Sequence, residues 1–273
     1  MTASELLDLS PDSILLTDRV AVVTGAGRGI GAATALALAR FGADAAVFDM
    51  DPTLLPDVVA QIRALGRRCL SDVLDGRDDD AVAAFLRRVH AELGTIDVLV
   101  NNAGGTFKAR FADVSPKGEH TLIRENFATV TNCVRHGVPL MSDGGAIVNV
   151  TSVEAYHSAP GFGVYAAMKA AVEQFTKTLA VEYGHRGIRV NCVAPDMMPT
   201  PGDAALAEGG THVIEGTHPT PLRRMGAAEE CAAVIVFLAS DMASFVNGTS
   251  IPVDGGTIAS GNWKTRLDGT FGL

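Results

Sequence analysis

The sequence predicts an α/β fold: one doubly wound parallel sheet of about seven strands, with helices on both faces. Short β-branched apolar runs alternate with longer helical stretches along the 273 residues. Such alternation builds right-handed βαβ crossovers, which give a parallel sheet covered on both sides. Hydrophobic residues make up 47% of the chain and charged residues 19%, which excludes a disordered protein and suits a sizeable core.

Each expected strand is a short run rich in valine, alanine or isoleucine, such as RVAVVT, IDVLV, AIVNVT and IRVNCVA. In chain order, the expected strands are residues 19–24, 45–49, 68–73, 96–100, 146–151, 188–194 and 250–253. The expected helices are residues 29–41, 54–65, 78–93, 116–141, 164–183 and 229–239. Gly94 and Gly184 are the expected stops of two of these helices.

No Pro/Ser-rich linker or internal repeat divides the chain, so one domain over residues 1–273 is expected. Two segments break the alternation. Residues 1–17 form an N-terminal extension, and residues 196–226 are a long stretch rich in Met, Pro, Gly, Thr and His. Because a loop this long in a compact domain is usually functional, we expect residues 196–226 to be a substrate lid. Residues 257–273 form a C-terminal tail.

Composition excludes several classes of protein. The formal charge is −9 with no basic run, which argues against a nucleic-acid partner. There is no run of about 18 apolar residues, so no membrane span is expected, and no Lys or Arg precedes Arg19, so no secretory signal is expected. Cys69, Cys133, Cys192 and Cys231 lie far apart without a CxxC pair. We therefore expect reduced core thiols in a cytoplasmic protein, and no metal site.

A glycine-rich turn, TGAGRGIG at residues 24–31, joins the first expected strand to the first expected helix. Its glycines permit a tight turn and a close backbone approach to a pyrophosphate, and the helix that follows offers free N–H groups to the phosphates. The context predicts a Rossmann-type nucleotide site. The expected cofactor-binding residues here are Gly25, Arg28, Gly29, Ile30 and Gly31.

Asp49 ends the second expected strand. A carboxylate at this place accepts hydrogen bonds from the adenosine ribose hydroxyls and repels a 2′-phosphate. It is followed by Met50 and Asp51 rather than by a basic residue, which favours NAD(H) over NADP(H). Arg28 is the opposing feature, because a basic residue in the turn could reach a 2′-phosphate. Alternatively, Asp49 is only a turn residue.

With these features in place, the chain resembles the short-chain dehydrogenase/reductase family, in its single-domain oxidoreductase branch. The resemblance covers residues 19–256. Its motifs occur in family order: the glycine turn, Asp72-Val73, Asn101-Asn102-Ala103-Gly104, Asn126, Ser152, Tyr165 to Lys169, Asn191 and Asp254-Gly255-Gly256.

The resemblance implies roles for these residues. Asp72 would contact the adenine amino group, with Val73 beside the ring. The other implied cofactor contacts are Asn102, Ala103, Gly104, Pro195 and Thr200, together with Tyr165 and Lys169. The implied catalytic set is Asn126, Ser152, Tyr165 and Lys169. The resemblance also implies subunit packing through the helices at 116–141 and 164–183, from which we expect a homotetramer, with a dimer as the alternative.

The chemistry of this set can also be argued from the residues. Tyr165 and Lys169 are four apart on an expected helix, so they share one face. A phenol has a pKa of about 10, and a nearby ammonium stabilises its phenolate and eases proton exchange. Ser152 follows a strand at the edge where open α/β sheets bind ligands. Asn126 lies mid-helix, where Asn is unfavourable; the resemblance implies a local helix distortion and a water relay ending at Lys169.

The substrate pocket is expected from loops that follow the strands. Candidate substrate contacts are Ser152, Glu154, His157, Phe162, Met197, Met198 and His212. Methionine and aromatic side chains indicate an apolar, adaptable pocket. Two departures from the family pattern stand out: Met168 precedes the lysine where serine is common, and Asp196 follows Pro195 where glycine is usual.

Three functions remain open from the sequence. The first is an NAD(H)-dependent oxidoreductase interconverting a secondary alcohol and a ketone on a lipophilic small molecule, such as a steroid or terpenoid. The second is an NADPH-dependent 3-oxoacyl thioester reductase. The third is a non-catalytic nucleotide-binding scaffold, which the complete catalytic set disfavours. The tail contains the one tryptophan, Trp263, which we expect to pack against a neighbouring subunit.

Overall fold

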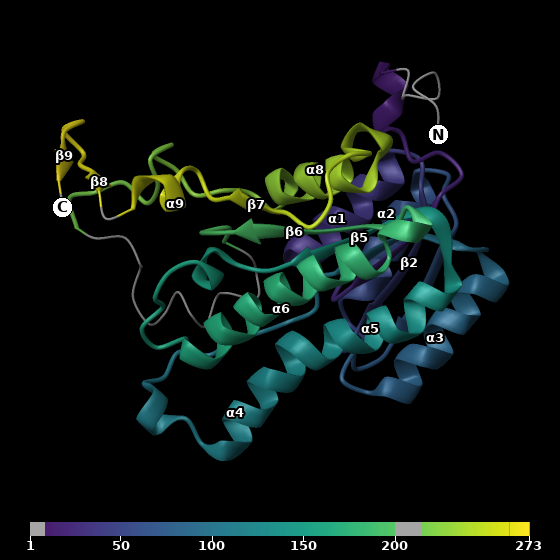
Figure 1. The fold of residues 1–273 in the computed structure, drawn as a ribbon, viewed down its shortest axis with the longest axis horizontal. Helices are drawn as coiled ribbons and strands as arrows, with labels where there is room; N and C mark the ends of the chain where they lie inside the picture. Colours follow the sequence, from purple (N-terminus) through teal and green to yellow (C-terminus); the bar gives the residue numbers. More distant parts are fainter. Residues whose placement is uncertain (1–8, 200–214, 262, 273) are drawn as a thin grey trace.

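The computed structural model describes residues 9–199, 215–261 and 263–272. Its centre is a parallel sheet of seven strands, as predicted, and the strands lie in the order β3-β2-β1-β4-β5-β6-β7 (Figure 1). The strands are β1 (Val20–Thr24), β2 (Asp44–Asp49), β3 (Cys69–Val73), β4 (Ile96–Asn101), β5 (Met141–Val150), β6 (Arg189–Pro195) and β7 (Ser250–Val253). Strand order reverses between β1 and β4. In open α/β sheets, ligands bind beyond the carboxyl ends of the strands at this reversal.

Helices cover both faces of the sheet (Figure 1). One layer contains α1 (Gly29–Arg40), α2 (Leu55–Ala64) and α8 (Ala228–Ala239); the other contains α3 (Asp79–Glu92), α5 (Thr129–Gly137) and α6 (Gly163–Glu182). Each helix layer packs on one face of the sheet and forms a hydrophobic core with it. Successive side chains of β1 point to opposite faces, so Val23 packs in the core with α1, α2 and α8, and Val22 packs in the core with α3, α5 and α6. Both faces of the strand are buried, which explains its continuous apolar run.

The helix expected at residues 116–141 is divided into pieces, contrary to the prediction. α4 (Pro116–Ile123) leads into a π-helical turn at Arg124–Ala128, then α5, then a 3₁₀ turn at Val138–Leu140. Asn126 lies in the π-helical turn, so the helix is distorted where the resemblance implied it. Pro139 lacks the N–H that a continuing helix needs, and β5 therefore starts at Met141, earlier than expected.

The C-terminal tail has more structure than the sequence predicted. After α9 (Thr257–Ser260), β8 (Lys264–Thr265) pairs antiparallel with β9 (Phe271–Gly272), and Arg266 forms a bridge with Thr217. Figure 1 shows this arm extending beyond the edge of the sheet. The tail thus pairs with the end of the expected lid. Of that lid, residues 200–214 lie outside the described residues, and with them the predicted contacts Thr200 and His212.

Two expectations from composition can be compared with the described part of the chain. No helix there has the length and apolar character needed to cross a membrane. The four cysteines are all buried and unpaired, as expected of core thiols.

Candidate active site

A cleft of about 1260 Å³ opens along the carboxyl ends of the strands. The glycine turn and Asp49 line one end, and Ser152 and Tyr165 line the other. This volume exceeds a typical pocket for one small ligand. It provides room for a dinucleotide and a substrate side by side.

Close packing explains the glycines of the turn. Gly25 has a φ of +61°, which favours glycine. A Cβ on Gly31 would lie 2.1 Å from the carbonyl oxygen of Gly25, so no side chain fits there. The Asn102 side chain donates hydrogen bonds to the carbonyls of Thr24 and Gly25, each 3.0 Å long. The turn is thereby fixed to the end of β4, and its backbone is exposed to the cleft through Gly25, Gly29 and Ile30.

Asp49 is held in place by the turn. Its Oδ2 accepts the backbone N–H of Gly27 at 3.0 Å, and its Oδ1 accepts that of Asp51 at the same distance. A Cβ on Gly27 would lie 2.9 Å from Asp49 Oδ2, so the turn packs directly against the carboxylate. Arg28 also lines this end of the cleft, as expected. Asp49, which favours NAD(H), and Arg28, which favours NADP(H), therefore lie at the same end of the cleft.

Asp72 and Val73 do not lie where their implied adenine contacts require. Both belong to β3, and Asp72 pairs with Arg88 of α3 at 2.9 Å. Val73 is 49% exposed, and neither residue is among those lining the cleft. The loop between β3 and α3 starts later, and Asp75, Gly76 and Arg77 face the cleft instead. Because ligands bind beyond strand ends, the end of β3 was the signal for this shift.

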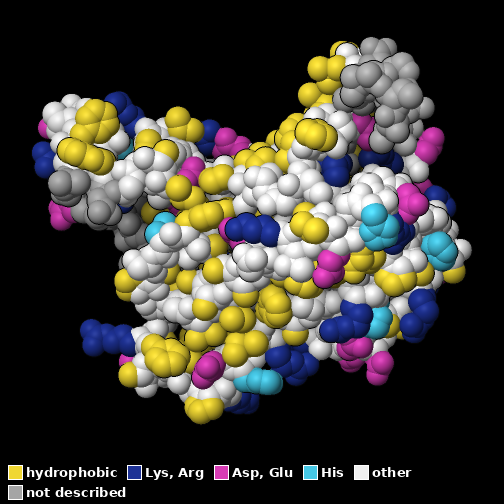
Figure 2. Space-filling view, in the orientation of Figure 1, with side chains coloured by type: hydrophobic (Ala, Val, Ile, Leu, Met, Phe, Trp, Pro, Cys, Tyr) yellow, Lys and Arg dark blue, Asp and Glu magenta, His cyan; other side chains and the backbone are white. Residues whose placement is uncertain are grey.

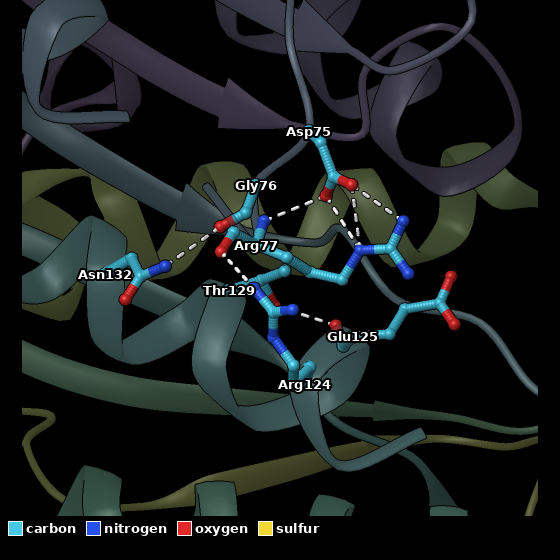
Figure 3. A network of polar contacts seen from close by, with 7 residues as sticks. All are labelled: Asp75, Gly76, Arg77, Arg124, Glu125, Thr129 and Asn132. Atoms are coloured by element: carbon cyan, nitrogen blue, oxygen red, sulfur yellow. Dashed lines mark hydrogen bonds and ion pairs between the residues drawn. The ribbon is translucent and has the colours of Figure 1, made fainter. Parts of the chain in front are cut away.

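This loop is fastened to the π-helical turn by a network of polar contacts (Figure 3). Asp75 and Arg77 form a forked ion pair, with contacts of 2.7–2.9 Å. The ion pair lowers the pKa of Asp75 and raises that of Arg77. Arg124 donates to the carbonyl of Arg77 at 2.8 Å, and Asn132 donates to that of Gly76 at 3.2 Å. The adenosine end of the cleft is thus connected to the segment that carries Asn126.

Glu125 is a carboxylate that the sequence analysis did not single out. It lines the cleft, and its side chain lies beside the Asp75–Arg77 pair (Figure 3). Its Oε1 is 2.7 Å from the position of a Cβ on Gly105, and burial raises its pKa. Its position next to Asn126 was the available signal, because the implied role of Asn126 puts this turn close to the cleft.

Ser152, Tyr165 and Lys169 come together at the other end. Lys169 is buried on α6, its Nζ lies 5.4 Å from the centre of the Tyr165 ring, and Nζ donates to the carbonyl of Val150 at 3.0 Å. Burial lowers the pKa of Lys169 to about 8. Ser152 is 5% exposed, and its hydroxyl donates to the Glu154 carboxylate at 2.5 Å.

Asn126 lies behind the cleft rather than in its lining. It is fully buried, and its Nδ2 donates to the carbonyls of Gly105 at 2.8 Å and Leu122 at 3.0 Å. Its Oδ1 and the Nζ of Lys169 lie 2.8 and 3.3 Å from one point, the place that a Cβ on Gly104 would occupy. Both side chains therefore border the space that a side chain at position 104 would fill.

The substrate end is more polar than predicted. The expected residues His157, Phe162, Met197 and Met198 line it, and Pro195 lies beside them. The lining also includes four charged or titratable residues that were not predicted as contacts: Lys108, Asp196, His218 and Lys264. The Oδ2 of Asp196 is buried without a hydrogen-bond partner. Lys264 comes from the C-terminal arm, so the tail forms part of this chain's own cleft.

Within the described ranges, no three His, Cys, Asp or Glu side chains are grouped closely enough to hold a metal ion. The side chains that line the cleft include a phenol, an ammonium, a hydroxyl and several carboxylates, and the glycine turn lies at one end.

Comparisons with known proteins show which family has this sequence and fold. A family model described as enoyl-(acyl carrier protein) reductase matches residues 25–257. The chain is 41% identical to cis-4-hydroxycyclohexanecarboxylate dehydrogenase of Sinomonas cyclohexanicum, over 89% of this chain and 97% of that one. It is 39% identical to a 3-oxoacyl-(acyl-carrier-protein) reductase of Thermotoga maritima, over 89% and 99%.

Solved structures with bound cofactor are also similar. Carveol dehydrogenase of Mycobacterium avium in complex with NAD superposes with a TM-score of 0.82 at 28% identity, covering 89% of this chain and 99% of that one. A short chain dehydrogenase of Burkholderia cenocepacia in complex with NADP gives 0.84 at 34% identity, with the same coverage. The shared sheet, the length of these matches and the family model show that this chain is an oxidoreductase of the short-chain dehydrogenase/reductase family.

Proposed function

We propose that the protein is an NAD(H)-dependent oxidoreductase that interconverts a secondary alcohol and a ketone on a small ring compound. The observation that carries this proposal is the placement of Ser152, Tyr165 and Lys169 in one cleft with the glycine turn and Asp49. The names of relatives support the substrate class, since they include the hydroxycyclohexanecarboxylate dehydrogenase and a cyclohexanol dehydrogenase of Rhodococcus.

The cleft fits a dinucleotide at its glycine end. The turn leaves no space for a Cβ at Gly31, and its backbone faces the cleft, as close approach to a pyrophosphate requires. Gly25, Arg28, Gly29 and Ile30 would hold the phosphates, with Asp49 on the adenosine ribose. We assign the adenine edge to Asp75 and Gly76 in place of Asp72 and Val73. Asn102, Ala103, Gly104 and Pro195 would line the rest of the cofactor.

Tyr165 is the proposed acid and base. The nicotinamide, when bound, accepts or supplies the hydride. Tyr165 takes the proton of the alcohol in oxidation and returns it in reduction. The Lys169 ammonium, near the ring, stabilises the phenolate and would also bind the nicotinamide ribose. Asn126, behind Gly104, would hold a relay water for Lys169. Ser152 would position the reacting oxygen.

Asp49 supports NAD(H) as the cofactor. Its two oxygens are already directed by backbone N–H groups, and a 2′-phosphate placed beside this carboxylate would be repelled. The test is calorimetric titration of NADH and NADPH side by side at fixed salt. Tighter binding of NADH, lost in Asp49→Ala, is the expected result. Tighter binding of NADPH would contradict the assignment. It would show that attraction of the 2′-phosphate by Arg28 outweighs its repulsion by Asp49.

The second candidate is an NADPH-dependent reductase of 3-oxoacyl thioesters. Two observations favour it: Arg28 lines the cofactor end of the cleft, and the Thermotoga relative carries this activity in its name. Reduction of an acetoacetyl thioester with NADPH, faster than any oxidation of cyclic alcohols with NAD, would establish it.

We also propose a homotetramer in the cytoplasm. Apolar side chains gather over α4 and α6 (Figure 2). The partly buried rings of Phe127, in the π-helical turn after α4, and of Phe175, on α6, pack edge-to-face with their centres 5.8 Å apart. Trp263, 55% exposed on the C-terminal arm, is a second candidate contact between subunits. Light scattering of Phe175→Glu, compared with the unaltered protein, tests the first surface: a smaller assembly is expected.

A further inference from the structure

The Ser152 hydroxyl already makes two of the three hydrogen bonds that it can form. Its proton is donated to Glu154 Oε2 at 2.5 Å, and its oxygen accepts the backbone N–H of Glu154 at 3.3 Å. A serine hydroxyl has one proton and two acceptor lone pairs. One lone pair therefore remains, and the proton is engaged by Glu154 and is not available to a substrate oxygen.

This arrangement conflicts with the role proposed for Ser152. The oxygen of a ketone has only lone pairs to offer, and the single proton of an alcohol must pass to Tyr165. In both directions, Ser152 must donate a hydrogen bond to the reacting oxygen. For that, its proton must leave Glu154. Glu154 is partly buried, so its carboxylate loses stabilisation when this donor leaves unless another donor replaces it.

We propose that the substrate supplies that donor. The substrate carries a hydroxyl or amino group on the carbon next to the reacting carbon, as in a vicinal diol or an α-hydroxy ketone, and Glu154 binds this group. This inference rests on the proposed function. The second group donates to Glu154, and Ser152 then turns its proton to the reacting oxygen. Glu154 still accepts one hydrogen bond and Ser152 still donates one after the exchange.

The spacing of Ser152 and Glu154 favours a second substrate group on the carbon next to the reacting carbon over one on a more distant carbon. Ser152 Oγ and Glu154 Oε2 are a single hydrogen bond apart, 2.5 Å. Two oxygens on adjacent carbons match two protein oxygens spaced this closely, whereas groups across a ring do not. In oxidation of a diol, the C–H bond breaks and its hydride passes to the nicotinamide. The O–H proton passes to Tyr165, and the product is the α-hydroxy ketone.

A substrate with only one hydroxyl cannot donate to Glu154. When Ser152 rotates its proton toward such a substrate, the carboxylate is left without that hydrogen bond. A hydrogen bond to a charged group is worth enough to change a rate constant by about 10- to 100-fold. Discrimination of this size is expected between a vicinal diol and the matching mono-alcohol.

The experiment compares 1,2-cyclohexanediol with cyclohexanol as substrates, with NAD as the oxidant. The unaltered protein should show a kcat/KM for the diol about tenfold or more above that for cyclohexanol. Glu154→Ala should bring the ratio close to one, and Glu154→Gln should leave an intermediate ratio, because its amide oxygen still accepts. Glu229→Ala, at an exposed site on α8, is the matched control and should keep the ratio. NADH titration of each variant reports whether its cofactor site is intact.

Equal use of both alcohols, a better use of cyclohexanol, or a diol preference that survives in Glu154→Ala would overturn the inference. So would failure to oxidise either alcohol. Failure of the proposed function is distinguishable, because it would appear as loss of NADH binding or as full activity in Tyr165→Phe. Oxidation of other secondary alcohols that depends on Tyr165 would leave the proposed function standing without the role of Glu154.

Discussion

The two ends of the cleft are built in different ways. The cofactor end is made of strand ends and glycines packed so closely that a Cβ on Gly31 would overlap a carbonyl oxygen. The substrate end is made of loops and an arm from the C-terminus, with charged side chains such as Glu154, Asp196 and Lys264. A site for one fixed ligand can be rigid, whereas a site that selects among substrates is built from segments that vary freely.

The largest effect on cofactor binding is expected at the glycine turn. Gly31→Ala would place a Cβ 2.1 Å from the Gly25 oxygen, so the turn must open. We expect loss of NADH binding by more than about 100-fold, or failure to fold. Gly163→Ala is the matched control, since nothing lies within 4 Å of its Cβ position and alanine is the better helix former by about 1 kcal/mol. Calorimetry and thermal unfolding measure both. If Gly31→Ala bound NADH with the native affinity, the close packing of the cofactor end would not be needed for cofactor binding.

A second effect concerns Lys169 and pH. Burial lowers its pKa from 10.5 to about 8, so the folded protein releases this proton while the unfolded chain still holds it. Because the unfolded state then binds more protons, the free energy of unfolding should rise between about pH 8 and 10.5. The gain is at most about 3 kcal/mol.

Urea unfolding of the native protein and of Lys169→Met, at pH 7.5 and 9.5, measures how much the free energy of unfolding rises with pH because of Lys169. The native protein should gain stability relative to the variant at the higher pH. A difference between the two proteins that does not change with pH would mean that the ammonium is solvated and not buried.

A smaller effect separates the two aspartates near β3. Asp75→Ala should weaken NADH binding about tenfold, because it removes a cleft carboxylate and frees Arg77 from its ion pair. Asp72→Ala should change it less than about twofold, since the Asp72–Arg88 pair is partly exposed and outside the cleft. Calorimetric titration distinguishes them. The opposite order would restore the sequence-based assignment.

The smallest effect is expected from the C-terminal arm. Truncation after Gly261 removes Lys264 and the pairing of the arm with Thr217. The KM for an alcohol substrate should rise severalfold while the Kd for NADH stays the same, because the arm lines only the substrate end. Steady-state kinetics and calorimetry check the two values. A weakened NADH affinity would show that the two ends are not independent.

The sequence was sufficient for the sheet and for the residues that depend on it. Strand ends and a glycine turn are local signals, so Gly25, Asp49, Ser152 and Tyr165 were all expected at one edge, and the structure places them there. The break in the helix at 116–141 was foreseen only through Asn126. Its extent depends on side-chain bonds to Leu122 and Gly105, which no local pattern contains.

The remaining features depend on contacts between distant segments. The end of β3 at Val73 was predicted correctly, but the shift from Asp72 to Asp75 depends on the path of the loop that follows, which no local pattern contains. The substrate wall joins residues from β5, the expected lid and the tail, which periodicity cannot bring together. Glu154 was a candidate contact from its spacing, but its bond to the Ser152 hydroxyl appears only in three dimensions.

The most direct measurement of the central claim uses Tyr165→Phe. Secondary cyclic alcohols are offered with NAD to the native protein and to the variant, and NADH binding is titrated in both. The account predicts a fall in kcat of about 10²–10⁴-fold with little change in NADH affinity. Full turnover in Tyr165→Phe would contradict the acid–base role of Tyr165 and, with it, the proposed reaction.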